Sequence, residues 1–189
     1  MTRQALALTV TLAVVSAAGA QTLRTEATRR AQDAGLRYSV PQNWERIPAP
    51  SDMRAAQYKI DGATSGPADD AELVLFFFGA GKGGTTEANL ERWYGQFTQP
   101  DGKPSKDAAV VTVRTVNDLK VTSVDLSGIY TAQMKPGDGA APRPETRMLA
   151  AAVEGPGGPW FFRIVGPAAT VAAAAADFQQ MLQSLEAHK

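Results

Sequence analysis

The chain has 189 residues, of which 44% are hydrophobic, 20% charged and 7% aromatic. This composition is typical of a globular protein and excludes full disorder and a collagen-like repeat. Lys and Arg number 19, as do Asp and Glu, so the balanced charge argues against a nucleic-acid partner or a membrane-surface domain. The sequence contains no Cys, which excludes disulfides, thiolate metal sites and cysteine nucleophiles.

The first 20 residues have the pattern of a secretory signal peptide. A short polar start with Arg3 leads into an apolar run from Ala5 to Val15, and small residues follow from Ser16 to Ala20. We expect cleavage between Ala20 and Gln21. The apolar run is too short for a transmembrane helix, which takes about 20 residues. The sequence therefore predicts a secreted or periplasmic protein with no membrane span in the mature chain.

The mature chain divides into a short tail and one domain. Residues 21–34 are polar, and we expect them to form a flexible N-terminal segment. Residues 35–187 are expected to fold as a single α/β sandwich domain. Strands are predicted at 36–40, 55–60 and 73–78. The third is apolar without alternation, which favours a central strand covered on both faces.

A helix is predicted after this third strand, with Thr85 or Thr86 as its N-terminal cap. Its apolar face would hold four residues at helical spacing, namely Leu90, Trp93, Tyr94 and Phe97. Residues 99–108, which contain two prolines and a glycine, are predicted to form a surface loop.

The second half alternates strand patterns with turns and ends in an alanine-rich amphipathic segment. Asn117 and Asp118 predict the turn of one hairpin, and the glycines of 155–158 predict the turn of another. In chain order we expect a hairpin, a long exposed loop, a second hairpin and a last helix, at 111–130, 134–145, 147–165 and 171–185.

This order of elements predicts the fold class. Two nearly all-apolar strands need cover on both faces, and two amphipathic helices can supply it. We therefore expect an α+β fold in which an antiparallel-rich sheet of about six or seven strands is sandwiched between helices, an α-β-α sandwich.

The sequence also resembles a known family. The strand, proline and tryptophan of Tyr38–Trp44, the element order, and a helix with characteristic polar and aromatic positions are similar to the PsbP-like α-β-α sandwich family; the helix positions are Asn89, Arg92, Trp93 and Phe97. The resemblance covers about residues 35–187 through short motifs. It implies a non-catalytic accessory or binding module, because the family spans extrinsic photosystem subunits, a nuclear import factor that binds a GTPase, and bacterial envelope proteins. It carries no functional residue over to this chain.

A glycine-rich loop between the third strand and the first helix is the candidate binding site. Its residues Lys82, Gly83, Gly84 and Thr85 combine a cation with backbone N–H groups at a helix start, which favours a small anion. The spacing differs from a phosphate-binding P-loop, because two glycines separate the lysine from the threonine. The alternative is a glycine-rich turn that binds nothing.

Few residues are suited to catalysis. The sole histidine is His188, next to the last residue, so a Ser-His-Asp triad, a histidine metal site and a histidine general base are not expected. No catalytic residue, metal site or cofactor is predicted. Carboxylates remain open as an alternative, through Glu72, Asp125 and Glu154. Arg163 interrupts an apolar strand, and it either extends to the sheet edge or pairs with Glu72 or Asp125.

The sequence thus favours an exported, non-catalytic binding or accessory protein whose partner is an unknown protein or small molecule. The alternative is an envelope hydrolase that uses carboxylates. A deep pocket with paired carboxylates would favour the enzyme, and an apolar groove or surface patch would favour the binding module.

Overall fold

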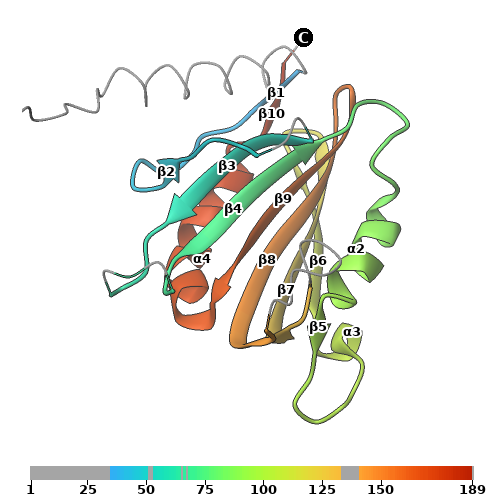
Figure 1. The fold of residues 1–189 in the computed structure, drawn as a ribbon. Helices are drawn as coiled ribbons and strands as arrows, with labels where there is room; N and C mark the ends of the chain where they lie inside the picture. The colour runs from blue at the N-terminus through green and yellow to red at the C-terminus, as the bar shows by residue number, and fades with distance from the viewer. Residues whose placement is uncertain (1–34, 51–52, 65, 67, 133–140, 189) are drawn as a thin grey trace, which may run out of the picture.

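The computed structural model describes residues 35–50, 53–64, 66, 68–132 and 141–188 (Figure 1). The signal peptide predicted for the first 20 residues and the flexible segment predicted for 21–34 lie outside the described residues. None of the helices in the described part is long and apolar enough to cross a bilayer.

The fold is dominated by one large antiparallel sheet, and Figure 1 shows helix α4 lying behind it. Within the described residues, the strands of this sheet follow the order β2-β3-β4-β9-β8-β7, and β5 and β6 both pair with β7. Strands β1 and β10 form a separate antiparallel pair. The elements in chain order are β1 (Leu36–Arg37), β2 (Glu45–Arg46), β3 (Arg54–Ile60), β4 (Ala71–Phe77), α2 (Thr86–Tyr94), β5 (Phe97–Thr98), α3 (Ser105–Ala108), β6 (Val110–Val116), β7 (Leu119–Tyr130), β8 (Arg143–Gly155), β9 (Gly158–Pro167), α4 (Ala168–Gln183) and β10 (Glu186–Ala187).

The antiparallel sheet, its two hairpins and the two longer helices confirm the sequence predictions for those elements. The β6–β7 hairpin turns through Asn117 and Asp118, whose φ angles are 46° and 66°. Two positive φ angles are what a two-residue turn of type I′ requires, and Asn and Asp tolerate them. Strand β4 pairs with β3 on one side and β9 on the other, so it is an interior strand as expected.

The first helix ends earlier than its apolar spacing predicted. It stops at Tyr94, where the Gly95 N–H donates to the Glu91 carbonyl at 3.0 Å. Phe97 therefore lies on β5 rather than on the helix, and its ring contacts Tyr130 of β7 edge-on at 5.1 Å between centroids. The loop predicted at 99–108 also contains the short helix α3, and the predicted strand at 36–40 is only two residues long.

The loop predicted at 134–145 is shorter at its C-terminal end, because β8 begins at Arg143. A proline within this strand is tolerated because the β7–β8 pairing shifts register between Gly128 and Tyr130, and Glu145 has a φ of 49°. Proline has no backbone N–H, and a bulge places it where the strand pairing requires no N–H donor. Residues 133–140 lie outside the described residues.

Two hydrophobic clusters lie on the two sides of the sheet, because successive residues of a strand point to opposite faces. The larger, here called the α4 cluster, joins α4 to β3, β4, β8 and β9; it includes Leu73, Leu75, Phe162, Ile164, Val171, Phe178 and Leu182. The smaller, here called the α2 cluster, includes Trp93, Phe97, Val124, Leu126, Met148, Ala150 and Phe161. Phe161 and Phe162, neighbours on β9, thus belong to different cores.

Candidate binding site

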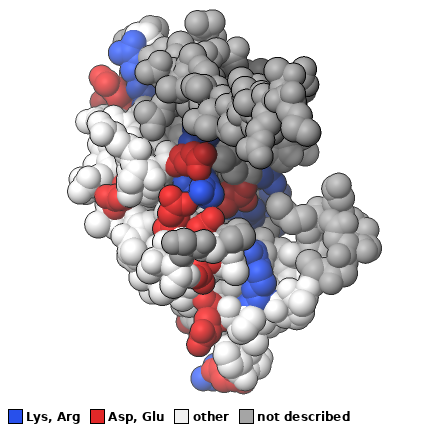
Figure 2. Space-filling model, turned by 60° about the vertical axis from the view of Figure 1, so that its left-hand side comes forward, with Lys and Arg blue, Asp and Glu red and all other residues white. Residues whose placement is uncertain are grey.

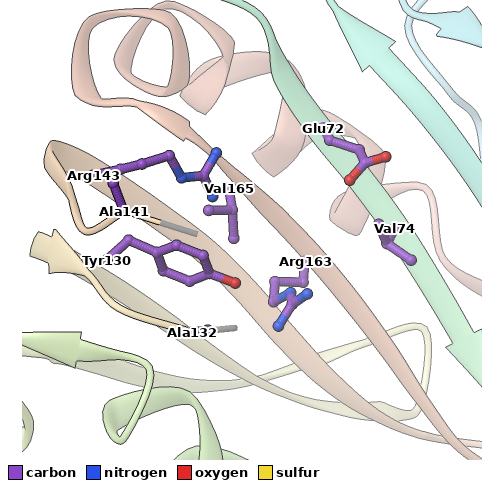
Figure 3. Close-up of a pocket in the computed structure, with 8 residues that line it drawn as sticks. All are labelled: Glu72, Val74, Tyr130, Ala132, Ala141, Arg143, Arg163 and Val165. Atoms are coloured by element: carbon purple, nitrogen blue, oxygen red, sulfur yellow. The ribbon is translucent and has the colours of Figure 1, made fainter. Parts of the chain in front are cut away.

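A cavity of about 310 Å³ lies on the α2 side of the sheet, between β4, β9 and the adjoining ends of β7 and β8 (Figure 3). It combines two basic residues and one acidic residue with a phenol ring and small apolar side chains. Its lining residues are Glu72, Val74, Tyr130, Ala132, Ala141, Arg143, Arg163 and Val165.

The strand register brings Arg163 to this face. Its neighbours Phe162 and Ile164 point into the α4 cluster, so Arg163 must point to the other side. Across the sheet it lies opposite Val74 of β4 and Ala150 of β8. Because alanine has only a methyl group, β8 leaves room for the long guanidinium side chain on this face.

The guanidinium group of Arg163 is only partly satisfied by hydrogen bonds. Its Nη1 donates to Oε1 of Gln96 at 2.8 Å, and its Cζ lies 5.9 Å from the centroid of the Phe76 ring. The buried Nε has no hydrogen-bond partner within the described part of the chain. Leaving a buried donor unpaired costs about 1–3 kcal/mol, and more for a charged group. Arg163 therefore lines the cavity while its buried Nε donor stays unpaired beneath the surface.

The charges around the cavity favour an anion. Burial lowers the pKa of Arg163, and the positive charges of Arg54 and Arg92 lower it further, whereas Tyr130 and Glu72 raise it. The guanidinium remains protonated, as arginine does in proteins.

The other side chains at the cavity mouth complete this electrostatic arrangement. Figure 3 shows the hydroxyl of Tyr130 directed toward Arg163. The guanidinium of Arg143 lies over the Tyr130 ring, with Cζ 4.7 Å from the centroid. Glu72, the one acid in the lining, accepts a hydrogen bond from Gln57 and lies 3.8 Å from Nη1 of Arg54. The acid is therefore paired with a basic residue outside the lining, and its negative charge also acts on Arg163.

Figure 2 shows basic and acidic residues interspersed over the face seen there, without a broad area of one sign. The sequence as a whole has equal numbers of basic and acidic residues.

The glycine-rich loop predicted to bind an anion has a different architecture from the cavity. Gly83, Gly84 and Thr85 meet at the start of α2, and Lys82 precedes them as an exposed residue. The Thr85 hydroxyl accepts from the Ala88 N–H at 3.2 Å, so it caps the helix as predicted.

The side chain of Asn89, which is 2% exposed, also fastens this loop. Its Nδ2 donates to the carbonyls of Gly83 and Thr85, each at 2.9 Å. Gly83 has a φ of 85°, and a Cβ there would lie 2.6 Å from the ring of Phe78. These contacts explain the glycine without a ligand, and anion binding by Lys82 stays a prediction.

The three candidate carboxylates are held in ion pairs. Asp125 accepts from Nε and Nη2 of Arg147 at 2.8 and 2.6 Å, and Glu154 accepts from Lys120 at 2.8 Å. With Glu72 beside Arg54, each acid faces a base on a neighbouring strand. The predicted pairing of Arg163 with Glu72 or Asp125 is wrong, since Arg163 donates to Gln96 instead.

Sequence reasoning missed three residues at this site: Gln96, Tyr130 and Arg143. Tyr130 was expected at a strand end and Arg143 within a loop, and Gln96 follows the helix. They meet Arg163 only through pairing between distant segments, such as Tyr130 with Arg143. The one signal available was a charged residue within an apolar strand, and it indicated Arg163 alone. Among the described residues, no group of three or more His, Asp or Glu is arranged to hold a metal ion.

Several solved structures are similar to this chain, among them the following two. One is cyanobacterial PsbP (CyanoP) from Synechocystis sp. PCC 6803, with 10% identity and a TM-score of 0.47, covering 82% of this chain and 94% of that chain. The other is PA94 from Pseudomonas aeruginosa, a protein of unknown function, with 13% identity and a TM-score of 0.45, covering 82% and 99%. The first is the kind of structure that Tyr38–Trp44 and the element order predicted. The likeness concerns the fold and assigns no residue or ligand.

No family model and no curated protein matches the sequence.

Proposed function

We propose that this protein is an exported, non-catalytic binding or accessory protein, built as an α-β-α sandwich, that binds a small organic acid in the Arg163 cavity. The observation that carries the proposal is the buried Nε donor of Arg163, unpaired beside a cavity that a second arginine also lines. A bidentate arginine contact is the usual way to hold a carboxylate.

The lining also fits the rest of such a ligand. Val74, Val165 and the Tyr130 ring offer apolar and aromatic surface next to the two guanidinium groups. Sites for small molecules have this mixture of an apolar lining and a few placed polar groups, and their volumes begin at about 300 Å³. A carboxylate with a short aliphatic or aromatic body therefore matches the cavity in charge and size.

Binding has more support here than hydrolysis. Glycosidase-type and aspartic-protease-type chemistry needs two carboxyl groups that divide the acid and base roles. Among the described residues, Glu72 is the one carboxylate in the lining, and it is engaged by Gln57 and Arg54. The arginine guanidinium stays protonated at ordinary pH, so it cannot take the role of the general acid or base. The envelope-hydrolase alternative therefore remains second.

The test is a titration of the mature protein with benzoate and with hexanoate, followed by amide and arginine Nε–H NMR signals. We expect shifts at Arg163 and at the residues around it. Arg163→Gln and Arg143→Gln should each weaken binding by about tenfold or more, because a hydrogen bond to a charged group contributes about 1.5–3 kcal/mol.

Arg37→Gln is the matched control, because Arg37 lies on β1 and contacts His188 rather than the cavity. Its affinity should equal that of the parent. Shifts confined to the loop around Lys82, or equal losses in all three variants, would contradict the proposal.

A further inference from the structure

Strand β6 concentrates the exposed apolar residues of the domain. Val110, Val111 and Val113 are 64%, 44% and 60% exposed, and Met53 is the one other large hydrophobic residue so exposed in the described part. Scattered single residues of this kind are ordinary on a protein surface. Here Val111 and Val113 share one face of the strand and Val110 points to the other, so the exposed apolar residues gather along one strand.

The same strand is an open edge of the sheet. Within the described residues β6 pairs with β7 on one side and with no strand on the other. Its pairing with β7 runs from Val110 to Val116 without a register shift. Proteins usually protect such an edge with Lys, Pro or a bulge, and β6 has none of these. Arg114 is its one charged residue.

The hairpin register shows which backbone groups face outward. Val116 and Leu119 flank the two-residue turn and form its closing pair. Hydrogen-bonded and non-bonded pairs alternate along an antiparallel ladder. The N–H and C=O groups of Val111, Val113 and Thr115 therefore point away from β7 and are free to pair with another strand.

The sequence of β6 is self-complementary. When two copies run antiparallel about Val113, Val113 faces itself, Val111 faces Thr115, and Arg114 faces Thr112. No like charges stand directly opposite, and Val–Val and Val–Thr pairs are favourable on a sheet. Arg114 is also held within its own copy by Gln179 of α4, at 2.5 Å.

We propose that β6 pairs with β6 of a second copy across a two-fold axis at Val113, joining the two large sheets into one. A second copy fits better than a charged peptide, because the edge offers no run of charge for such a peptide to match. Three outward-facing residues on each strand would give about six main-chain hydrogen bonds. One short strand pair buries little area, so the dimer should be weak.

Because the chain contains no cysteine, introduced cysteines can test the proposed register of the β6–β6 pairing. Val113→Cys places two thiols directly opposite, with Cα atoms about 5.5 Å apart, which suits a disulfide. Val111→Cys is the matched control on the same face. Its two thiols would lie four residues apart along the strands, about 13 Å, which is too far to bridge. Mild oxidation should therefore link Val113→Cys at least tenfold faster than Val111→Cys.

Analytical ultracentrifugation of the mature protein up to about 500 μM gives the second measurement, in the range expected for a small interface. We expect a concentration-dependent dimer, and Val113→Glu should weaken it by at least tenfold, since two carboxylates would face each other. Met53→Glu, equally exposed but off β6, should leave the dimer unchanged.

Three outcomes would overturn the proposal. They are a monomer throughout this range, equal cross-linking of the two cysteine variants, and a dimer that survives Val113→Glu. Because residue 113 is exposed, these variants should fold, and a melt that matches the parent's verifies it.

Discussion

The two faces of the large sheet differ in what their strands present. On the α4 face, β9 contributes Phe162 and Ile164, both fully buried in an apolar cluster. On the α2 face, the residue between them is Arg163, with Gln96 and an open cavity beside it. β9 therefore contributes Phe162 and Ile164 to the α4 cluster, while its other face contributes both to the α2 cluster and, through Arg163, to the candidate site.

The two helices differ in how much of the sheet they can cover. α4 has 16 residues and packs along the sheet, whereas α2 has nine. A helix rises 1.5 Å per residue, so α2 is much shorter than the strands beside it. The part of the face beyond its reach holds Arg163 and the cavity.

The largest loss of stability should come from the α4 face. Phe178 of α4 is 1% exposed, and Phe178→Ala should lower the free energy of unfolding by ~4 kcal/mol, within the range for large aromatic truncations. Chemical denaturation measures this directly. A loss below about 1 kcal/mol would mean that the α4 cluster can collapse around the gap.

Trp93→Ala should destabilise the α2 face by ~3 kcal/mol, at the lower end of the range for this kind of truncation. Trp93 is 4% exposed and contacts Phe161 edge-on, but it belongs to the smaller cluster. Leu90→Ala is the control on the same helix, because Leu90 is only half-buried, and its loss should be smaller. A larger loss for Trp93 than for Phe178 would reverse the comparison of the two faces.

Arg163→Met should separate stability from binding. It removes the buried unpaired Nε but also removes the donor to Gln96, so the free energy of unfolding should change by less than about 1.5 kcal/mol in either direction. Binding of an organic acid should be lost. A loss of several kcal/mol in unfolding experiments would make Arg163 a structural residue instead.

The elements that build the α4 face could be predicted from the sequence far better than the residues of the candidate site. The uninterrupted run at 73–78 indicated an interior strand, and the alanine-rich amphipathic segment indicated the last helix, α4. These signals are local, because burial repeats with the period of the element itself.

The site depends instead on which distant segments pair. Gln96 follows a helix that ends at Tyr94, and Arg143 begins a strand whose bulge admits Pro144. Gly95 is a local signal for the end of the helix, but no local signal shows that Gln96 and Arg143 lie near Arg163, so Arg163 could be singled out as unusual while its partners could not. The position of Phe97 was also missed. Its spacing from Trp93 fits a helix, but the helix ends at Tyr94 and Phe97 lies on β5.

Lys82→Ala tests whether a small anion binds at the glycine-rich loop or at the Arg163 cavity. We expect weaker binding of inorganic phosphate by about tenfold, as for loss of a charge-assisted hydrogen bond, and almost no change in stability because Lys82 is exposed. Amide NMR shifts locate the anion. If phosphate shifts the residues around Arg163 and not those around Lys82, the loop is only a turn.

The smallest effect concerns how α2 begins. Hydrogen bonds from the backbone N–H of Glu87 and from the Thr85 hydroxyl lower the pKa of the Glu87 carboxyl group below its ordinary 4.5. Helix α4, by contrast, has no acidic residue in its first turn. A lowered pKa in the folded state means that the stabilisation is complete above the unfolded pKa and is lost as the pH falls through the folded one. The free energy of unfolding should therefore fall slightly below about pH 4.5, and Glu87→Gln should reduce that slope. A titration midpoint for Glu87 at or above its ordinary value, measured by carboxyl NMR, would show that α2 is not capped by its own side chains.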